Sequence, residues 1–273
     1  MAINWVDRVA THPGRVQLTP VQGQTNIYDM ERADEPTVAG TPINAANLNA
    51  MQKNMGLDAN MTVYVAVSGS DATGNGSSTA PYQTITKALS TIPKNLNGYQ
   101  ATINIASGTY AEVLTITGFS GGTLNFTGAE GDAVSVINIV VRNCDDVVFS
   151  NLNYNLVGAD NVTYGVHLTN SQIRVLTSFN VSNASTTGVY ALLGSTFYLM
   201  NLNVSNVGEG IGASNGARII VGNISGSARE RGMRAVGGGI VAYTNNSLSA
   251  PVMFATSGGG RIYSGSQTNI PNY

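Results

Sequence analysis

The sequence predicts an all-β fold, a single-stranded parallel β-helix in which about 22 residues form each turn of a solenoid. The stretch GVYALLGSTFYLMNLNVSN at Gly188–Asn206 has a near copy, GVHLTNSQIRVLTSFNVSN, directly upstream. The glycines that begin successive copies are separated by 23, 22 and 22 residues, a period typical of solenoids, and they are Gly165, Gly188, Gly210 and Gly232. Apolar and polar residues alternate within each copy, which indicates strands rather than helices. At this period residues 101–268 make roughly seven turns, and stacking at about 4.8 Å per turn gives a rod about 35 Å long.

Three strands per turn allow the side chains that fill the tube to be assigned. The expected inward stacks are Val166, Val189, Ile211 and Met233 in the first strand, Ile173, Phe197, Ile219, Val241 and Ile262 in the second, and Val181, Val204, Ile224 and Leu248 in the third. The expected outward columns include Val140, His167, Tyr190, Gly212, Arg234 and Met253 in the first strand, and Val148, Arg174, Tyr198, Ile220, Ala242 and Tyr263 in the second. These columns mix apolar residues with Tyr and Arg. Either another chain covers part of this surface, or the apolar residues are scattered over a monomer.

The chain before the repeats is expected to have two parts. Residues 1–58 carry prolines and charges without a sustained apolar period, apart from a short helix predicted at 44–55. We therefore expect an extended N-terminal attachment segment at 1–58. A strand, a loop and a capping helix are expected at 59–100, and the β-helix at 101–273.

The elements of 59–100 follow from local pattern. MTVYVAV at 61–67 predicts a strand, and the Gly/Ser/Asp-rich residues 68–81 predict a loop. Apolar residues within 83–92 have the spacing of one short amphipathic helix, and they are Ile85, Ala88, Leu89 and Ile92. This helix can cover the N-terminal end of the solenoid.

Composition excludes several classes of protein. Charged residues make up only 10% of the chain and the net charge is −2, so nothing favours nucleic acid or membrane insertion. No signal peptide and no transmembrane helix are predicted, because the chain lacks the apolar runs that they need. Cys144 is the only cysteine and is expected to be buried, while His12 and His167 lie far apart, so no metal or cofactor is expected. The Asn-x-Ser/Thr sequons, such as those at Asn180 and Asn203, are interpreted as a by-product of composition.

The segment VYVAVSGSDATGNGSSTAPYQTITKAL at Val63–Leu89 resembles the leading segment of right-handed parallel β-helix proteins of the pectate-lyase-like superfamily. It combines a strand, a Gly/Asp/Ser loop, a Pro-aromatic-x-Thr-Ile run at residues 81–85 and a short helix. The resemblance extends over about 200 residues. It implies the fold and its right-handed coiling.

A second resemblance covers about 50 residues. INWVDRVATHPGRVQLTPV at the N-terminus and GTPINAANLNAM at Gly40–Met51 resemble the leading segment of tail and baseplate proteins from phages and prophages of Gram-positive bacteria. The resemblance implies a homotrimer in a virion tail or phage-tail-like particle, docked to other tail or baseplate proteins. It also implies synthesis in the host cytoplasm and release on lysis. The expected particle-anchoring residues are Trp5, Tyr28, Leu48 and Met51.

No catalytic residue is predicted, although an enzyme stays the alternative. Hydrolysis of a glycan needs two carboxylates about 5 to 10 Å apart, and the register aligns no such pair. A lyase would need calcium ligands beside a basic residue. The residues that come closest to this arrangement are Asp145 and Asp146 near Arg174. The alternative function is therefore a polysaccharide depolymerase acting on host envelope glycans, with any site formed between chains.

Four outward residues are candidates for binding a host-surface glycan, because sugar rings stack on aromatic faces and guanidinium groups pair with hydroxyls. They are Arg174, Tyr198, Arg218 and Tyr263. The same residues could instead line a contact between subunits. The expected function is a structural tail fibre or baseplate component, anchored by its N-terminus, that projects a β-helical rod for host attachment.

Overall fold

The structure is a computed structural model of the chain, and it describes residues 9–10, 16–23, 25, 27–32, 36–38, 56–131, 133–151, 153–157 and 163–265. The chain divides into two compact units, Met1–Met55 and Gly56–Tyr273. The helix predicted at 44–55 lies outside the described residues. So do three of the residues predicted to anchor the chain, which are Trp5, Leu48 and Met51.

The first unit contains two small antiparallel pairs of strands, β1 with β4 and β2 with β3. Tyr28 lies opposite Pro20 in the second pair and is half exposed. Leu18 and Met30 lie opposite each other in the same pair and expose 56% and 70% of their surface. This pair of strands therefore presents apolar side chains to solvent. The strands are β1 (Val9–Ala10), β2 (Val16–Pro20), β3 (Tyr28–Arg32) and β4 (Pro36–Val38).

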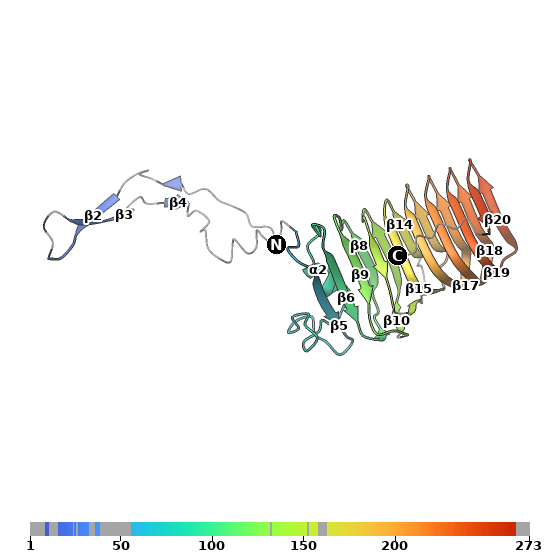
Figure 1. Ribbon diagram of the computed structural model, residues 1–273, viewed down its shortest axis with the longest axis horizontal. Coiled ribbons are helices and arrows are strands. Elements are labelled where there is room, and N and C mark those ends of the chain that lie inside the picture. The colour runs from blue at the N-terminus through green and yellow to red at the C-terminus, as the bar shows by residue number, and fades with distance from the viewer. Residues whose placement is uncertain are drawn as a thin grey trace. The chain divides into compact units, whose positions relative to one another are not determined.

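Parallel strands stacked turn upon turn form the second unit (Figure 1). Its described residues contain one helix, α2 (Ile85–Thr91), and one sheet of seventeen strands. The strands are β5 (Met61–Val65), β6 (Gln100–Ile105), β7 (Gly108–Thr109), β8 (Val113–Thr117), β9 (Thr123–Thr127), β10 (Ala133–Val136), β11 (Asn138–Arg142), β12 (Val147–Phe149), β13 (Asn153–Leu156), β14 (Tyr164–Thr169), β15 (Gln172–Ser182), β16 (Thr187–Leu192), β17 (Thr196–Ser214), β18 (Arg218–Val236), β19 (Ile240–Ser249), β20 (Val252–Ser257) and β21 (Arg261–Ser264).

The predicted fold class is confirmed: the second unit is a parallel β-solenoid of about seven turns with about 23 residues per turn. The second-strand stack shows the repeat most clearly, because each residue pairs with its equivalent one turn later. Its inward residues are Ala101, Leu124, Val147, Ile173, Phe197, Ile219, Val241 and Ile262. The first-strand stack, Val166, Val189, Ile211 and Met233, is confirmed as well, and all four of its side chains are fully buried.

The predicted third-strand stack is correct for Val181, Val204 and Leu248, but Gly226 takes the place predicted for Ile224. Val181 pairs with Val204, but Val204 then pairs with Gly226 rather than Ile224. The patterns Asn203-Val-Ser and Asn223-Ile-Ser look equivalent in the sequence, yet Asn223 pairs with Asn201. Gly226 has a left-handed φ of 102°, and a Cβ there would collide with the carbonyl oxygen of Val204. The backbone at this position therefore requires glycine, and the register moves by two residues.

The last turn also differs from the expected register. Ala255, not Met253, pairs with Arg234 in the first-strand outward column, because Phe254 pairs with Met233. Met253 instead contacts Gly232, the leading glycine of the preceding copy. The last copy therefore has methionine where the earlier copies have glycine.

The leading glycines mark an inner corner where no side chain fits. A Cβ at Gly188 would lie 2.9 Å from the carbonyl oxygen of Gly210 and 3.1 Å from Cγ1 of Val204. At Gly210 it would lie 2.6 Å from the carbonyl oxygen of Gly232 and 2.9 Å from Cδ2 of Leu248. Real Cβ atoms do not approach so closely, since interiors are close-packed. The glycine repeat that marks the sequence is therefore a packing requirement of each turn.

A second corner, after each first strand, requires a left-handed backbone. Seven successive turns place a residue with φ between 47° and 72° there. Glycine and asparagine tolerate this region, whereas leucine does not. Leu193 is the exception, with φ at 55° and about half of its surface exposed. The corner residues are Gly118, Asn143, Asn170, Leu193, Asn215, Gly237 and Gly258.

Helix α2 packs on β5, β6 and β8, at the N-terminal end of the stack (Figure 1). Its residues Ile85, Ala88 and Leu89 are buried. The hydroxyl of Thr84 caps the helix by accepting a hydrogen bond from the Lys87 amide. Glu112, from the loop before β8, accepts the amides of Ile85 and Thr86 at 2.9 and 2.8 Å. The predicted capping helix is thus present, two residues shorter at its start than the predicted range.

Replacing Leu193 by asparagine is expected to raise the free energy of unfolding by about 1 kcal/mol, because a left-handed backbone costs an ordinary residue roughly 1–2 kcal/mol. Urea unfolding of the full chain, followed by circular dichroism, measures the difference. Leu192→Asn is the matched control, since Leu192 does not have a positive φ, and it should not stabilise. Equal or lower stability of Leu193→Asn would contradict the strain at this corner.

Candidate functional site

The outward face of the third-strand stack is polar and carries no charge. Columns of asparagine and serine run across successive turns on β10, β13, β15, β17, β18 and β19. Val157 is an apolar member at the edge of this face and is 42% exposed. The columns are Ser178, Asn201, Asn223 and Asn245; then Ser135, Asn155, Asn180, Asn203, Ser225 and Ser247; and then Val157, Ser182 and Ser205. We call this surface the Asn/Ser face.

The asparagines of the Asn/Ser face hydrogen-bond from turn to turn. The Nδ2 of Asn223 donates to the Oδ1 of Asn201 at 2.7 Å, and the Nδ2 of Asn245 donates to the Oδ1 of Asn223 at the same distance. Asn180 donates in the same way to Asn155 at 2.9 Å. In all three bonds the later turn donates to the earlier one, so the amide dipoles are aligned and reinforce each other. An amide has two donor hydrogens and two acceptor lone pairs, so the ladder leaves part of each amide for other partners.

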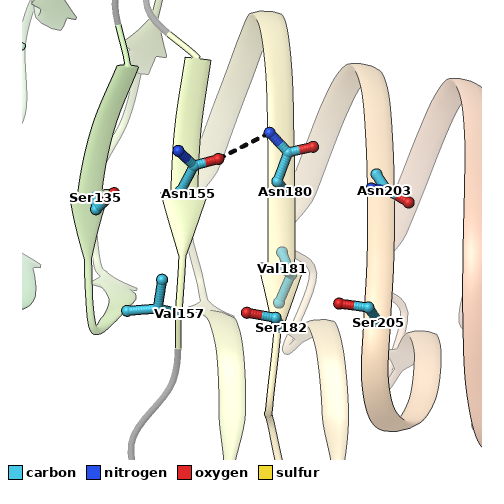
Figure 2. Close-up of a pocket in the computed structure, with 8 residues that line it drawn as sticks. All are labelled: Ser135, Asn155, Val157, Asn180, Val181, Ser182, Asn203 and Ser205. Atoms are coloured by element: carbon cyan, nitrogen blue, oxygen red, sulfur yellow. Dashed lines mark hydrogen bonds between the residues drawn. The ribbon is translucent and has the colours of Figure 1, made fainter.

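A hollow of about 280 Å³ lies at the N-terminal side of this face (Figure 2). Figure 2 shows Asn155 and Asn180 joined by their hydrogen bond, with Asn203 on the next turn. All of its lining side chains are neutral. Amides and hydroxyls without charges suit a neutral ligand rich in hydroxyl groups. The lining residues are Ser135, Asn155, Val157, Asn180, Val181, Ser182, Asn203 and Ser205.

The Asn/Ser face was missed by the sequence reasoning, although its signal was present. Asn180-Val-Ser and Asn203-Val-Ser are two of the sequons interpreted as a by-product of composition. In the structure the middle valines, Val181 and Val204, are buried, while Asn and Ser alternate with them along the strand. The motif recurs because each turn repeats an outward-inward-outward strand.

The structure brings together three of the four predicted glycan-binding residues. Arg174 and Tyr198 are vertical neighbours, and Arg218 follows one turn after Tyr198 in the adjacent column. Arg174 is engaged in a bidentate ion pair with Asp146, at 2.9 and 2.6 Å. Its guanidinium group is therefore engaged by a carboxylate of the solenoid itself.

Tyr263, the fourth predicted residue, lies apart from the other three. Ile220 and Ala242 separate it from Tyr198 in the column, and both are buried. Its hydroxyl accepts a hydrogen bond from Nη1 of Arg261 at 3.4 Å. The four residues therefore do not form one site.

Several carboxylates of the solenoid are engaged in structural contacts. Asp145 accepts the amide of Gly121 at 2.8 Å, and Asp146 accepts the hydroxyl of Thr123 in addition to Arg174. Asp71 accepts the amides of residues 83 and 84 and the hydroxyl of Thr84. Burial raises the pKa of Asp71, but these hydrogen bonds outweigh burial and hold the pKa below its ordinary value. These carboxylates stabilise loops and faces of the solenoid.

Glu209 is the most enclosed carboxylate among the described residues, with only 4% of its side chain exposed. It accepts Nη1 of Arg231 at 2.6 Å and Nε of Arg234 at 2.8 Å. The hydroxyl of Thr187, one turn earlier, donates to it at 3.4 Å. Burial lowers the pKa of Arg234, but Glu209 outweighs burial and raises it above its ordinary value. Two arginines thus compensate one buried charge.

The described residues contain neither a metal centre nor a membrane-spanning helix. They hold no group of three or more His, Cys, Asp and Glu side chains placed to bind a metal ion. None of their helices is long and apolar enough to cross a membrane. Cys144 is buried, as predicted, and burial raises the pKa of its thiol.

Comparison with known proteins identifies one segment of the chain. Residues 67–118 match the family described as "Protein of unknown function (DUF1565)". The matched segment runs from the loop after β5 through α2 to the end of β8. No curated protein and no solved structure matches the chain. The match therefore concerns the N-terminal turns of the solenoid and names no activity.

Substituting Glu209 by glutamine is expected to lower the free energy of unfolding by about 2 kcal/mol, because hydrogen bonds to charged groups contribute about 1.5–3 kcal/mol each. Urea unfolding at pH 7 measures the loss. Glu230→Gln is the matched control, since Glu230 is an exposed glutamate in the next strand, β18, and it should unfold like the parent. Equal losses of stability in both variants would show that the ion pairs of Glu209 are not the cause.

Proposed function

We propose that the chain is a structural component of a phage tail or phage-tail-like particle that attaches to a glycan on the host surface. The observation that carries the attachment role is the uncharged Asn/Ser face with its hollow, which offers amides and hydroxyls at the spacing of the turns. Neutral sugars are recognised by groups of this kind, held in place before binding. The particle context rests on the resemblance of about 50 N-terminal residues to the leading segments of tail and baseplate proteins.

The proposed architecture suits this role at both ends of the chain. A backbone ladder that continues from turn to turn makes a stiff rod, because each turn is held by its neighbours. In the first unit, Leu18, Tyr28 and Met30 expose apolar surface that a neighbouring tail protein would cover. The first unit is thus the proposed anchor, and the solenoid is the part that meets the host.

We propose a homotrimer as the working assembly. Leu176 and Met200 directly follow the paired residues Val175 and Leu199, and they expose 47% and 56% of their surface. Two large apolar side chains on successive turns are suited to contact between subunits. Symmetric association would bury the same edge of every chain.

A polysaccharide depolymerase is the second candidate function. It needs two carboxylates that are available to a substrate. Asp71, Asp145, Asp146 and Glu209 each accept hydrogen bonds from loops, strands or arginines of the solenoid itself. These contacts favour binding without cleavage, and release of oligosaccharides from host envelopes would favour the enzyme instead.

The attachment role is tested by removing the amides of the hollow. The double variant Asn180→Ala/Asn203→Ala should bind purified host envelope polysaccharide at least tenfold more weakly in biolayer interferometry, a loss of about 1.4 kcal/mol. Asn245→Ala is the control, because Asn245 belongs to the same face but not to the hollow. Unchanged binding by the double variant would contradict the role of the hollow, and loss on Tyr198→Ala alone would move the site to the second-strand face.

The particle context and assembly are tested separately. For the location, immunogold labelling of intact particles should place the protein at the tail tip. For the assembly, native mass spectrometry should give three times the 28.4 kDa mass of the chain. A Leu176→Asp/Met200→Asp variant should shift the mass toward the monomer, since it places charges in the proposed contact. A monomeric parent chain would contradict the trimer, and gold absent from the tail would contradict the location.

A further inference from the structure

A strip of aromatic and arginine side chains lies on the outward face of the first-strand stack, apart from the Asn/Ser face. His167, Tyr190 and Arg234 belong to its central column, with Gly212 between the last two. Arg142 lies one turn before His167, on β11. We call this surface the cationic aromatic strip, and its members are Arg142, Tyr164, His167, Tyr190, Arg231 and Arg234.

Three rings at the centre of the strip stack on one another. The ring of Tyr164 lies 4.7 Å from that of His167 and 5.0 Å from that of Tyr190, with interplanar angles of 29° and 12°. All three side chains are partly exposed. The result is an aromatic surface that spans two turns of the solenoid.

Gly212 makes room for this arrangement. A Cβ at Gly212 would lie 2.7 Å from Cδ2 of Tyr190, so any other residue would displace the ring. The Tyr190 ring therefore lies over the backbone of the next turn, where its hydroxyl hydrogen-bonds with Ser214 at 2.8 Å. Beyond it, the guanidinium carbon of Arg234 lies 5.8 Å from the ring centroid.

Positive charge flanks the aromatic rings on both sides. Arg231 and Arg234 are held by Glu209, yet 43% and 29% of their side chains stay exposed. Arg142 is exposed at the other end. Three arginines thus outnumber the one enclosed carboxylate. Burial and the charge of Arg142 lower the pKa of His167, so this imidazole is neutral at pH 7.

Two polar atoms beside the rings lack partners. Among the described residues, the buried side-chain atoms without a hydrogen bond are Nε2 of His167 and Oδ1 of Asn138. Both belong to residues that contact Tyr164, since His167 stacks on its ring and Nδ2 of Asn138 donates to its carbonyl oxygen at 3.4 Å. Unpaired buried atoms cost free energy and call for a partner. A buried water would supply one.

We propose that the cationic aromatic strip binds an anionic polysaccharide. Sugar rings stack on Tyr164 and Tyr190, and acidic substituents pair with the arginines at the two ends. The chemistry required is a sugar chain that carries carboxylate or phosphate groups. This site is independent of the hollow on the Asn/Ser face, whose lining is neutral.

Isothermal titration of the full chain with matched polymers tests the strip. Carboxymethyl-dextran and dextran phosphate differ from dextran only in their acidic groups, so both acidic forms should bind at least tenfold more tightly than dextran at low salt. If one acidic dextran binds more tightly than the other, its substituent is the one that the strip prefers. This result supports the proposal only when the variants described below weaken the binding of that dextran. Equal binding of the three polymers would overturn the proposal, as would tighter binding of single-stranded DNA.

Variants locate the binding on the strip. Tyr164→Ala should weaken binding of the acidic dextrans at least tenfold, and Arg142→Ala at least threefold. Arg142 is exposed, so its removal leaves the fold intact, and thermal unfolding checks both variants. Lys87→Ala, which removes a charge on α2, should bind like the parent. Parent-like binding by both strip variants would overturn the proposal. The Asn180→Ala/Asn203→Ala variant changes only the hollow, so it should keep its affinity for acidic dextran even if the proposed attachment role fails.

Discussion

Backbone pairing between equivalent strands of successive turns is the constraint on which the rest of this structure depends. A fixed rise of about 4.8 Å per turn places every residue directly above its equivalent, so one unfavourable contact would recur in each turn. Gly188 and Gly210 therefore lack side chains, because the neighbouring turn occupies that space. Asparagine and glycine recur at the left-handed corner for the same reason. The sequence repeats because each turn makes the same contacts.

The same repetition converts single side chains into surfaces. Asparagines that follow one another in a column form a hydrogen-bonded ladder, as Asn201, Asn223 and Asn245 do. Where the column holds aromatic residues, the rings stack instead. Charge is distributed unevenly as well: residues 163–265 contain six arginines and two glutamates, whereas residues 56–157 contain three basic and seven acidic residues. The later turns are therefore the ones that favour an anionic ligand.

The sequence was sufficient to predict the fold and two of the three inward stacks, because alternation and period together define a register. It was insufficient for the third strand, where Asn-x-Ser recurs in two registers and only the backbone at Gly226 selects one. The sequence placed Asp146 near Arg174, but only the structure shows that the two form an ion pair, which joins two columns diagonally. Tyr164 shares the parity of the inward Val166, yet its ring stacks on the outward His167. Period and alternation define which residues stack, but they carry no information about backbone conformation at a corner or about contacts between columns.

A disulfide scan of outward positions tests the stacking most directly. Thr196, Arg218 and Ile240 are successive members of one column. Neighbours in adjacent turns lie within disulfide reach, whereas residues two turns apart are about 9.6 Å from each other. The account predicts that Thr196→Cys/Arg218→Cys oxidises to an intrachain disulfide in the folded protein and that Thr196→Cys/Ile240→Cys does not. The reverse result, or no disulfide in the adjacent pair, would contradict the solenoid and every surface derived from it.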